Sequence, residues 1–296
     1  MIRSEPTVPR QHEDPALFRE AVNYTAAETG FSSRLLEKDY FLTLVLAFLS
    51  GQPELPLVFK GGTCLAKIHA GFYRLSEDLD FMISVKVSST RKERQGLAAP
   101  VKALLDKLPT YLPAFQVSEP LQGANQSRQY LGSLSYQSLV SPEPQTIKLE
   151  VSLREALLTP VATAEAKTLL LDPVSEKQLV GPVSVRCLSL EEALAEKCRA
   201  ALSRREAAIR DFFDIDHAVQ KLGFSPDAPA FVSLVKQKLT VAGNEPVDVG
   251  PERKKDLQAQ LAARLRPVLR PQDFEAFDLD RAFGLVENLA EDVALP

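Results

Sequence analysis

The sequence predicts an α/β (α+β) fold, in which N-terminal helices precede a small mixed sheet and a helical C-terminal domain follows it. Apolar residues recur at helical spacing near both ends of the chain, whereas short alternating runs characterise residues 115–153. We therefore expect a flexible arm over residues 1–15, an α/β domain over 16–185 and a helical domain over 186–296.

The first predicted elements are helices. Helical spacing covers residues 15–50 in two pieces, and the apolar run Leu57–Phe59 then indicates a short buried strand. The pair Gly61-Gly62 ends this strand, and Thr63 is suited to cap the short helix that follows.

The rest of the sheet is predicted from alternation. A second strand covers Leu79–Val85, an amphipathic helix covers residues 91–108, and later strands include Tyr130–Tyr136 and Thr146–Leu153. Prolines punctuate residues 156–189, which we expect to form connecting segments.

Every pattern beyond these segments is helical. Ser189 and Glu192 match a capping box that opens the first of these helices. Further helices are expected over residues 206–222, 228–241 and 251–266.

Composition and charge indicate a soluble globular protein. Hydrophobic residues make up 45% and charged residues 25%, with a net charge of −4. A protein that coats nucleic acid through its overall field is usually basic, but clusters such as Arg204-Arg205 leave a local patch open beside the ordinary interpretation of a solvated helix face. We expect no secretory signal, because the opening residues lack an apolar core, and no membrane span, because the run Tyr40–Leu49 is too short.

The spacing of the cysteines does not match a disulfide framework or a zinc-binding motif. Cys64, Cys187 and Cys198 include no Cys-x-x-Cys pair, and no histidine stands at ligand spacing. This argues against a disulfide framework or a zinc site and indicates the reducing cytoplasm as the location. A metal would then be held by carboxylate oxygens, which favours Mg²⁺ or Mn²⁺.

The first candidate for chemistry is Lys60-Gly61-Gly62-Thr63 at the strand-to-helix corner. Paired glycines let the backbone approach a phosphate, and amides at a helix start favour anionic oxygens. Thr63 adds a hydroxyl and Lys60 a positive charge. An ordinary turn is the alternative interpretation.

Carboxylates form the second candidate. On an extended chain Asp78 and Asp80 share a face while Leu79 points into the core, and a divalent cation between the two would offset their repulsion. Glu150, on the polar face of a later strand, could join them as a third ligand. The alternatives are two exposed aspartates and an ordinary half-exposed strand.

The order of these features is more specific than each feature alone. Phosphoryl and nucleotidyl transfer need a triphosphate gripped by backbone amides and carboxylates that hold Mg²⁺ beside it. The glycine turn is suited to the first task and the aspartate pair to the second.

Charged residues stand at unusual positions on two helices of the predicted helical domain. Lys197 falls on the apolar face of its helix, and Asp211 and Asp214 lie three residues apart on the next helix. A role in an active site accounts for this, and so does a lysine that reaches solvent with aspartates paired to nearby arginines.

Several motifs resemble the AbiEii/AbiGii toxin family of nucleotidyltransferases, the toxins of abortive-infection and type IV toxin–antitoxin systems, which include the mycobacterial MenT group. The motifs that carry the resemblance are Glu37-Lys38-Asp39-Tyr40, Lys60-Gly61-Gly62-Thr63, Arg74–Phe81, Lys148–Val151, Glu196-Lys197 and Arg210–Ile215. They span residues 37 to about 217, and the tail after about residue 225 adds nothing.

The resemblance implies a DNA-polymerase-β-like nucleotidyltransferase core in the α/β domain. It implies that Asp78 and Asp80 bind metal and that Lys197 and Asp211 come from the helical domain to close the cleft, where Asp211 orients or deprotonates the acceptor. Glu150, rather than aspartate, stands at the third carboxylate position. The residues implied to hold or lie near the triphosphate are Lys60, Gly61, Gly62, Thr63, Arg74, Ser76 and Lys148.

The leading hypothesis is therefore a toxin that transfers a nucleotide from an NTP to an RNA acceptor, the 3′ end of tRNA, and so inhibits growth in phage defence. The acceptor hydroxyl would attack the α-phosphate in line, with pyrophosphate leaving. A cognate antitoxin would be encoded separately. The alternatives are transfer to a small molecule or protein, and a catalytically silent NTP-binding regulator, against which the intact pair Asp78 and Asp80 weighs.

Overall fold

The computed structural model describes residues 8–294, in two compact units. The first unit holds the chain up to Leu157 together with Val161–Leu188, and the second holds Leu158–Pro160 together with the chain from Ser189 onward. Of the expected arm, residues 1–7 lie outside the described part. The described part of the arm contacts the rest of the first unit, since Nδ1 of His12 lies 2.8 Å from the hydroxyl oxygen of Tyr40.

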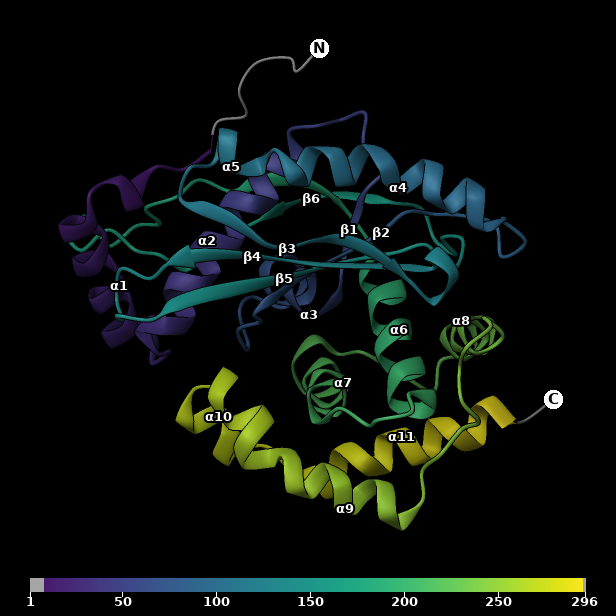
Figure 1. The fold of residues 1–296 in the computed structure, drawn as a ribbon. Helices are drawn as coiled ribbons and strands as arrows, with labels where there is room; N and C mark the ends of the chain where they lie inside the picture. The colour runs from purple at the N-terminus through teal and green to yellow at the C-terminus, as the bar shows by residue number, and fades with distance from the viewer. Residues whose placement is uncertain (1–7, 295–296) are drawn as a thin grey trace. The chain divides into compact units, whose positions relative to one another are not determined.

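The first unit is built around a seven-stranded mixed sheet with the strand order β3-β4-β5-β2-β1-β7-β6 (Figure 1). Pairing is parallel between β2 and β5 and between β1 and β7, and antiparallel elsewhere. This confirms the predicted α/β class with a mixed sheet. The strands are β1 (Val58–Lys60), β2 (Asp78–Met82), β3 (Phe115–Ala124), β4 (Gln129–Gln137), β5 (Pro144–Ser152), β6 (Ala162–Ala166) and β7 (Val183–Cys187).

The helices of this unit begin and end where the sequence places caps. Asp14 accepts hydrogen bonds from the backbone of Ala16 and Leu17, and Gly30 ends the first helix in the left-handed conformation. Thr90 and Glu93 form a complete capping box. The helical elements are η1 (Gln11–Glu13), α1 (Pro15–Thr29), α2 (Ser33–Ser50), α3 (Gly61–Cys64), η2 (Leu65–His69), α4 (Arg91–Asp106), α5 (Leu108–Tyr111) and η3 (Asn125–Ser127).

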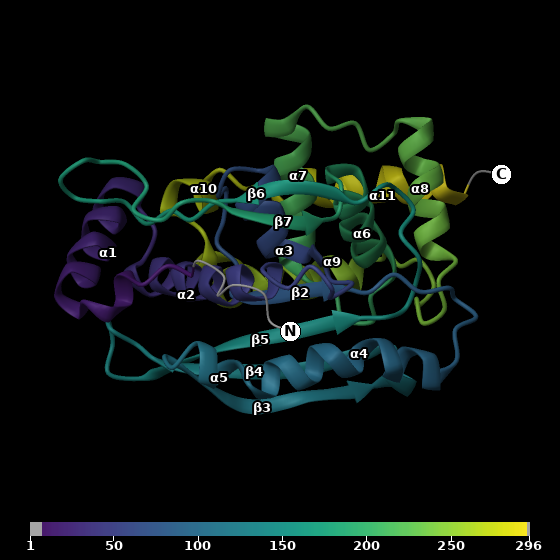
Figure 2. The ribbon, with the colours of Figure 1, turned by 90° about the horizontal axis from the view of Figure 1, so that it is seen from above.

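One core joins the sheet to its helices. Leu79, Phe81 and Leu149 belong to the same buried cluster as Phe41 of α2 and Val101 of α4. Seen from above, α4 runs alongside β3 (Figure 2). Because side chains alternate along a strand, burial of this face leaves Asp78 and Asp80 on the opposite one.

The segment that carries Glu37-Lys38-Asp39-Tyr40 lies inside α2 and ties the unit together. Asp39 is buried and its Oδ1 lies 2.7 Å from Nζ of the equally buried Lys67. Glu37 accepts hydrogen bonds from the hydroxyl of Ser138 and the backbone of Leu139, both at 2.6 Å. These side chains hold distant loops against α2.

Two strands were not predicted. Residues 156–189 were expected to form only connections, but they contain β6 and β7, which extend the sheet beyond β1. Both strands have five residues, and β6 is rich in alanine, which has low β propensity. Pairing with β1 and with each other outweighs that weak local preference.

The second unit is helical, as expected. Ser189 caps α6, but only half of the predicted capping box forms, since the carboxylate of Glu192 instead accepts hydrogen bonds from Leu158, Thr159 and the buried Lys238. The elements are α6 (Leu190–Ser203), α7 (Ile209–Leu222), α8 (Pro229–Leu239), α9 (Pro251–Gln260), η4 (Leu261–Leu265), η5 (Arg266–Val268), α10 (Pro271–Glu275) and α11 (Leu279–Ala294). Among the described residues, no helix combines the length and apolarity that crossing a membrane requires.

Candidate active site

Three predicted site residues stand in one row on the face of the sheet opposite the core, and all three are half-buried. Lys60 on β1 is the register partner of Asp80 on β2, and Asp80 is the partner of Glu150 on β5. Directly paired residues on neighbouring strands point to the same face, with their Cβ atoms about 4.5–5.5 Å apart. A cation and two carboxylates therefore gather where β1 turns into α3.

A second row runs parallel to the first. Asp78 pairs with Lys148, Lys148 with Ser133, and Ser133 with Glu119. The Ser133 hydroxyl donates to Glu119 Oε2 at 3.1 Å. The sequence indicated Asp78 and Lys148 as site residues. Glu119 was missed, because no local pattern shows that it pairs with Ser133 and so joins the same row.

Except for Lys60, the residues of the two rows line a cavity of about 390 Å³ in the first unit. Its walls combine four carboxylates with one lysine, so the cavity is acidic and favours a cation, or an anionic ligand that brings a cation with it. The lining residues are Asp78, Asp80, Glu119, Leu131, Gly132, Ser133, Thr146, Lys148, Leu149 and Glu150.

The glycine turn packs directly on the charged row. Gly61 has φ +78°, and a Cβ at this position would lie 2.1 Å from Oδ2 of Asp80. A Cβ on Gly62 would lie 2.5 Å from a guanidinium nitrogen of the buried Arg74. Only glycine allows this approach, which places backbone amides between an aspartate and an arginine.

Side chains around the turn fix its position. The Thr63 hydroxyl donates to the backbone oxygen of Asp78 at 2.5 Å, so α3 is fastened to β2. Glu77 is ion-paired with Arg34 at 2.7 Å and with Lys38 at 3.2 Å, which anchors to α2 the loop that carries Ser76.

The carboxylates suit a hard cation by their chemistry. Asp78, Asp80 and Glu150 offer oxygen ligands, which Mg²⁺ and Mn²⁺ prefer. The oxygens of these three carboxylates do not all lie within 4.8 Å of one another. Among the described residues, the one group of three potential metal ligands with that spacing is Cys64, His69 and Cys187. Binding one ion to all three carboxylates therefore requires rotation of their side chains.

The second unit explains the charge on the apolar face of α6. Lys197 Nζ lies 2.8 Å from Asp211 and 2.9 Å from Asp214, and Arg204 lies 3.1 Å from the second oxygen of Asp211. Burial alone would raise the pKa of the Asp211 carboxyl, but the charges of Lys197 and Arg204 outweigh it and hold this pKa below its usual value. Lys197 thus has buried partners and does not depend on reaching solvent.

The same unit carries a strongly basic cavity of about 510 Å³. Arg204, Arg205 and Arg264 are exposed at its walls, and Arg210 is half-buried. The remaining lining residues are Glu206, Ala207, Ala208, Ile209, Asp256 and Gln260. From the sequence alone, the Arg204-Arg205 cluster was open between a patch and a solvated helix face. The structure shows that it helps to line a cavity.

Known proteins are similar to this chain in sequence and in fold. The family model described as "Nucleotidyl transferase AbiEii toxin, Type IV TA system" matches residues 46–284. Among solved structures, the chain is similar to MenT4, the nucleotidyltransferase toxin Rv2826c from Mycobacterium tuberculosis H37Rv. The TM-score is 0.59 at 20% identity over 93% of this chain and 98% of that one. It is also similar to JHP933 from Helicobacter pylori, with a TM-score of 0.48 at 18% identity over 94% of this chain and 93% of that one. No curated protein sequence matches.

Proposed function

Because the chain belongs to the AbiEii family of nucleotidyltransferase toxins of type IV toxin–antitoxin systems, we propose that it transfers a nucleotide from an NTP to the 3′ end of tRNA and so inhibits growth. NTP-dependent nucleotidyl transfer is the reaction of the family, and the family implies a separate antitoxin. We also propose that the reaction uses Mg²⁺ or Mn²⁺ and that the protein acts in phage defence.

The observation that carries the proposal is the row of Lys60, Asp80 and Glu150 with Gly61 packed against it. The amides of the glycine turn and the Lys60 ammonium supply positive potential for a triphosphate. The carboxylates beside them supply ligands for the cation that accompanies it. These two functions are adjacent because β1 and β2 are neighbours in the sheet.

In the first unit, one group of residues is proposed to contact the phosphates and another to bind the metal ion. Lys60, Arg74, Ser76 and Lys148 are proposed to contact phosphate oxygens, together with the turn formed by Gly61, Gly62 and Thr63. Asp78 and Asp80, with Glu150, are proposed to hold Mg²⁺ or Mn²⁺. When bound, the ion would polarise the α-phosphate and neutralise charge that develops on the attacking and leaving oxygens.

Asp211 is proposed to interact with the hydroxyl group of the acceptor, either by orienting it or by removing its proton. A carboxylate with a lowered pKa, paired with Lys197 and Arg204, is a weak base. Orientation of the hydroxyl by a hydrogen bond therefore suits Asp211 better than removal of its proton, and Lys197 positions Asp211.

The arginine-lined cavity of the second unit supports an RNA acceptor. Arginines bind phosphate through two parallel hydrogen bonds, and clustered arginines give a local positive field despite the net charge of −4. Transfer to a small molecule would not need such a surface.

The test is incubation with each labelled NTP, Mg²⁺ and total tRNA. We expect label on tRNA with the wild type and loss of at least about a hundredfold in rate for Asp80→Asn, since electrostatic contributions at reacting centres are of this size. Asp106→Asn, at an exposed position at the end of α4, is the matched control and should retain the wild-type rate.

Oxidation of the tRNA 3′ ribose with periodate separates the possible acceptors. Label that disappears with oxidised tRNA supports the 3′ end, whereas label that persists places the acceptor elsewhere on the RNA. Label only on protein or on a small molecule would contradict the RNA acceptor. NTP binding without transfer to any acceptor would instead indicate a silent regulator.

A further inference from the structure

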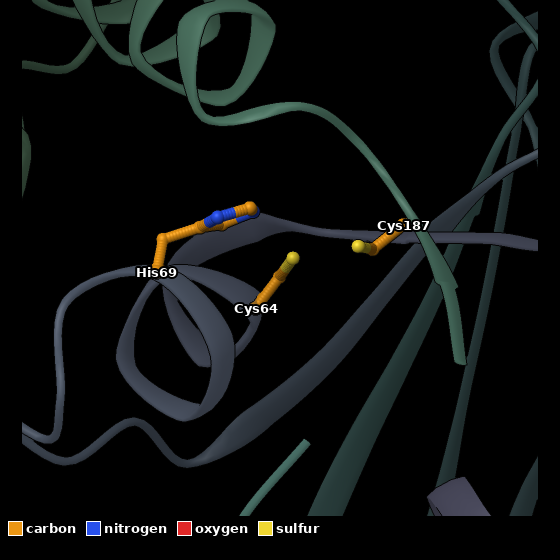
Figure 3. A group of neighbouring side chains, drawn as sticks. All are labelled: Cys64, His69 and Cys187. Atoms are coloured by element: carbon orange, nitrogen blue, oxygen red, sulfur yellow. The ribbon is translucent and has the colours of Figure 1, made fainter. Parts of the chain in front are cut away.

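A second cluster of potential ligands lies on the other side of the glycine turn. Cys64 is the last residue of α3, His69 the last of η2 and Cys187 the last of β7. One ligand atom from each lies within 4.8 Å of the other two, and Figure 3 shows the three side chains converging from these elements. All three belong to the first unit.

Local backbone geometry builds this cluster. His69 follows Cys64 by five residues, a spacing that an α-helix would place on different sides. Here Leu65–His69 form a π-helical turn, closed by a hydrogen bond from the amide of Ala70 to the oxygen of Leu65 at 2.8 Å. The wider turn brings both side chains to one side, and such turns occur frequently at functional sites.

The sheet supplies the third member. Cys187 is the register partner of Phe59, and the amide of Leu188 donates to the oxygen of Phe59 at 3.0 Å. Cys187 is thereby fixed beside the end of β1, immediately before Lys60. Cys64 and Cys187 are fully buried and form no disulfide.

The histidine is oriented as a metal ligand would be. Its Nε2 lies 3.0 Å from the backbone oxygen of Leu188. A carbonyl oxygen only accepts, so Nε2 carries the proton and the lone pair of the neutral ring is on Nδ1. A hydrogen bond from one ring nitrogen to a backbone carbonyl commonly fixes the tautomer of histidine ligands.

We propose that Cys64, His69 and Cys187 form a Zn²⁺ site. Two thiolates and one imidazole are the donors that zinc selects and Mg²⁺ does not. Zinc is usually four-coordinate, with Zn–S about 2.3 Å and Zn–N about 2.0–2.1 Å, so a solvent molecule or an anion would complete the site. The three ligand atoms already lie within 4.8 Å of one another, so the side chains have to move closer together to reach these distances.

The place of the cluster in the fold agrees with a structural role for the ion. The ion would join the end of β7 to the first helical turn after Gly61-Gly62-Thr63. It would stiffen the corner that the proposed nucleotide site uses, but its ligands take no part in that site.

The test begins with metal analysis of the full chain, purified without a polyhistidine tag, exposed to excess Zn²⁺ under reducing conditions and desalted. The wild type should retain about one Zn²⁺ per chain. Cys64→Ser, His69→Gln and Cys187→Ser should each lose most of it. Cys198→Ser, which removes an equally buried cysteine in α6, is the matched control and should retain the ion.

Cobalt substitution and thiol counting keep the test independent of how the variants fold. Wild-type protein with Co²⁺ should show a thiolate-to-cobalt charge-transfer band that Zn²⁺ abolishes, and unfolding in chelator should expose all three cysteine thiols. No retained zinc and no charge-transfer band would overturn the proposal. A single free thiol in protein purified without reductant would also overturn it, because the pair would then form a disulfide. Asp80→Asn should still bind zinc, so this result does not depend on the proposed transfer activity.

Discussion

Asp80 on β2 and Glu150 on β5 are direct register partners on parallel strands, so two carboxylates from distant parts of the sequence lie side by side on one face of the sheet. Like charges so close repel each other unless a cation lies nearby. Lys60 on the other side of Asp80 provides one such cation, and a divalent ion would provide another.

The role of Glu150 as a metal ligand is tested by Glu150→Gln. The change keeps the shape of the side chain but removes a negative charge, so the Mg²⁺ concentration for half-maximal transfer should rise by at least the roughly tenfold that even outer-sphere partners contribute. The measurement is a Mg²⁺ titration of the transfer rate. Glu143→Gln, at an exposed site just before β5, should leave the titration unchanged. An unaltered titration for Glu150→Gln would remove this residue from the metal site.

The glycine turn is tested by comparing Gly61→Ala with Gly71→Ala. Both residues have positive φ, of 78° and 64°, so each alanine should cost about 1–2 kcal/mol in the free energy of unfolding, and Gly61→Ala should cost more because its Cβ also clashes with Asp80. Only at position 61 does the new Cβ meet Asp80, because nothing lies within 4 Å of a Cβ at position 71. Urea unfolding and transfer assays together should show that both variants lose stability and that only Gly61→Ala loses activity. Equal loss of activity in both would contradict the close packing of the turn on Asp80.

The buried pair of Asp39 and Lys67 should be essential to the fold of the first unit. Lys67→Met leaves Asp39 buried without its ammonium partner and should lower the free energy of unfolding by about 3–5 kcal/mol. Adding Asp39→Asn should recover part of this loss, because the uncompensated charge is removed. Denaturant unfolding of the two single variants and the double variant completes the cycle. Additive losses would show that the two residues do not interact.

The pKa of Asp211 predicts a pH dependence of stability. This pKa is lowered in the folded protein, so the unfolded chain binds the proton more readily. The stabilisation is complete above the ordinary aspartate value, near pH 4, and is lost as the pH falls through the folded value. Thermal unfolding between pH 7 and pH 3 should therefore show a smaller acid destabilisation for Asp211→Asn than for the wild type. Asp106→Asn should follow the wild type, and an unchanged profile for Asp211→Asn would contradict the pairing with Lys197.

The arginine-lined cavity predicts a salt-dependent contribution to tRNA affinity. Arg205→Gln with Arg264→Gln should weaken binding and reduce the slope of log affinity against log salt by about 0.7–0.9 for each phosphate that the variant no longer neutralises. Binding titrations at several salt concentrations measure this slope. Lys255→Gln removes an exposed charge in the same unit outside the cavity and should change the slope less. Equal effects for each charge removed would indicate that only net charge matters.

Local sequence patterns predicted much of the candidate site. Alternation in β2 placed Asp78 and Asp80 on one face, and the glycine pair marked the turn between β1 and α3. The register was not predictable, because no local signal states that Glu150 stands beside Asp80 or that Glu119 completes the second row.

The cysteine cluster shows the limit of spacing rules. Residues 64 and 69 are close in sequence, but only a π-helical turn aligns them, and the sequence did not predict one. Cys187 joins them through the pairing of β7 with β1, and β7 itself was missed among prolines and short runs. Cys-x-x-Cys spacing detects sites formed by one local segment, whereas the sheet assembles this cluster from distant ones.

Transfer of a nucleotide to tRNA can be tested by following the α- and γ-phosphates of one NTP separately. Parallel reactions with tRNA would use the NTP labelled at either phosphorus. We expect the α-label to become attached to tRNA while the γ-label leaves as pyrophosphate, in equal amounts and only with Asp80 intact. Attachment of the γ-label to tRNA, or release of phosphate without labelled RNA, would contradict nucleotidyl transfer to this acceptor.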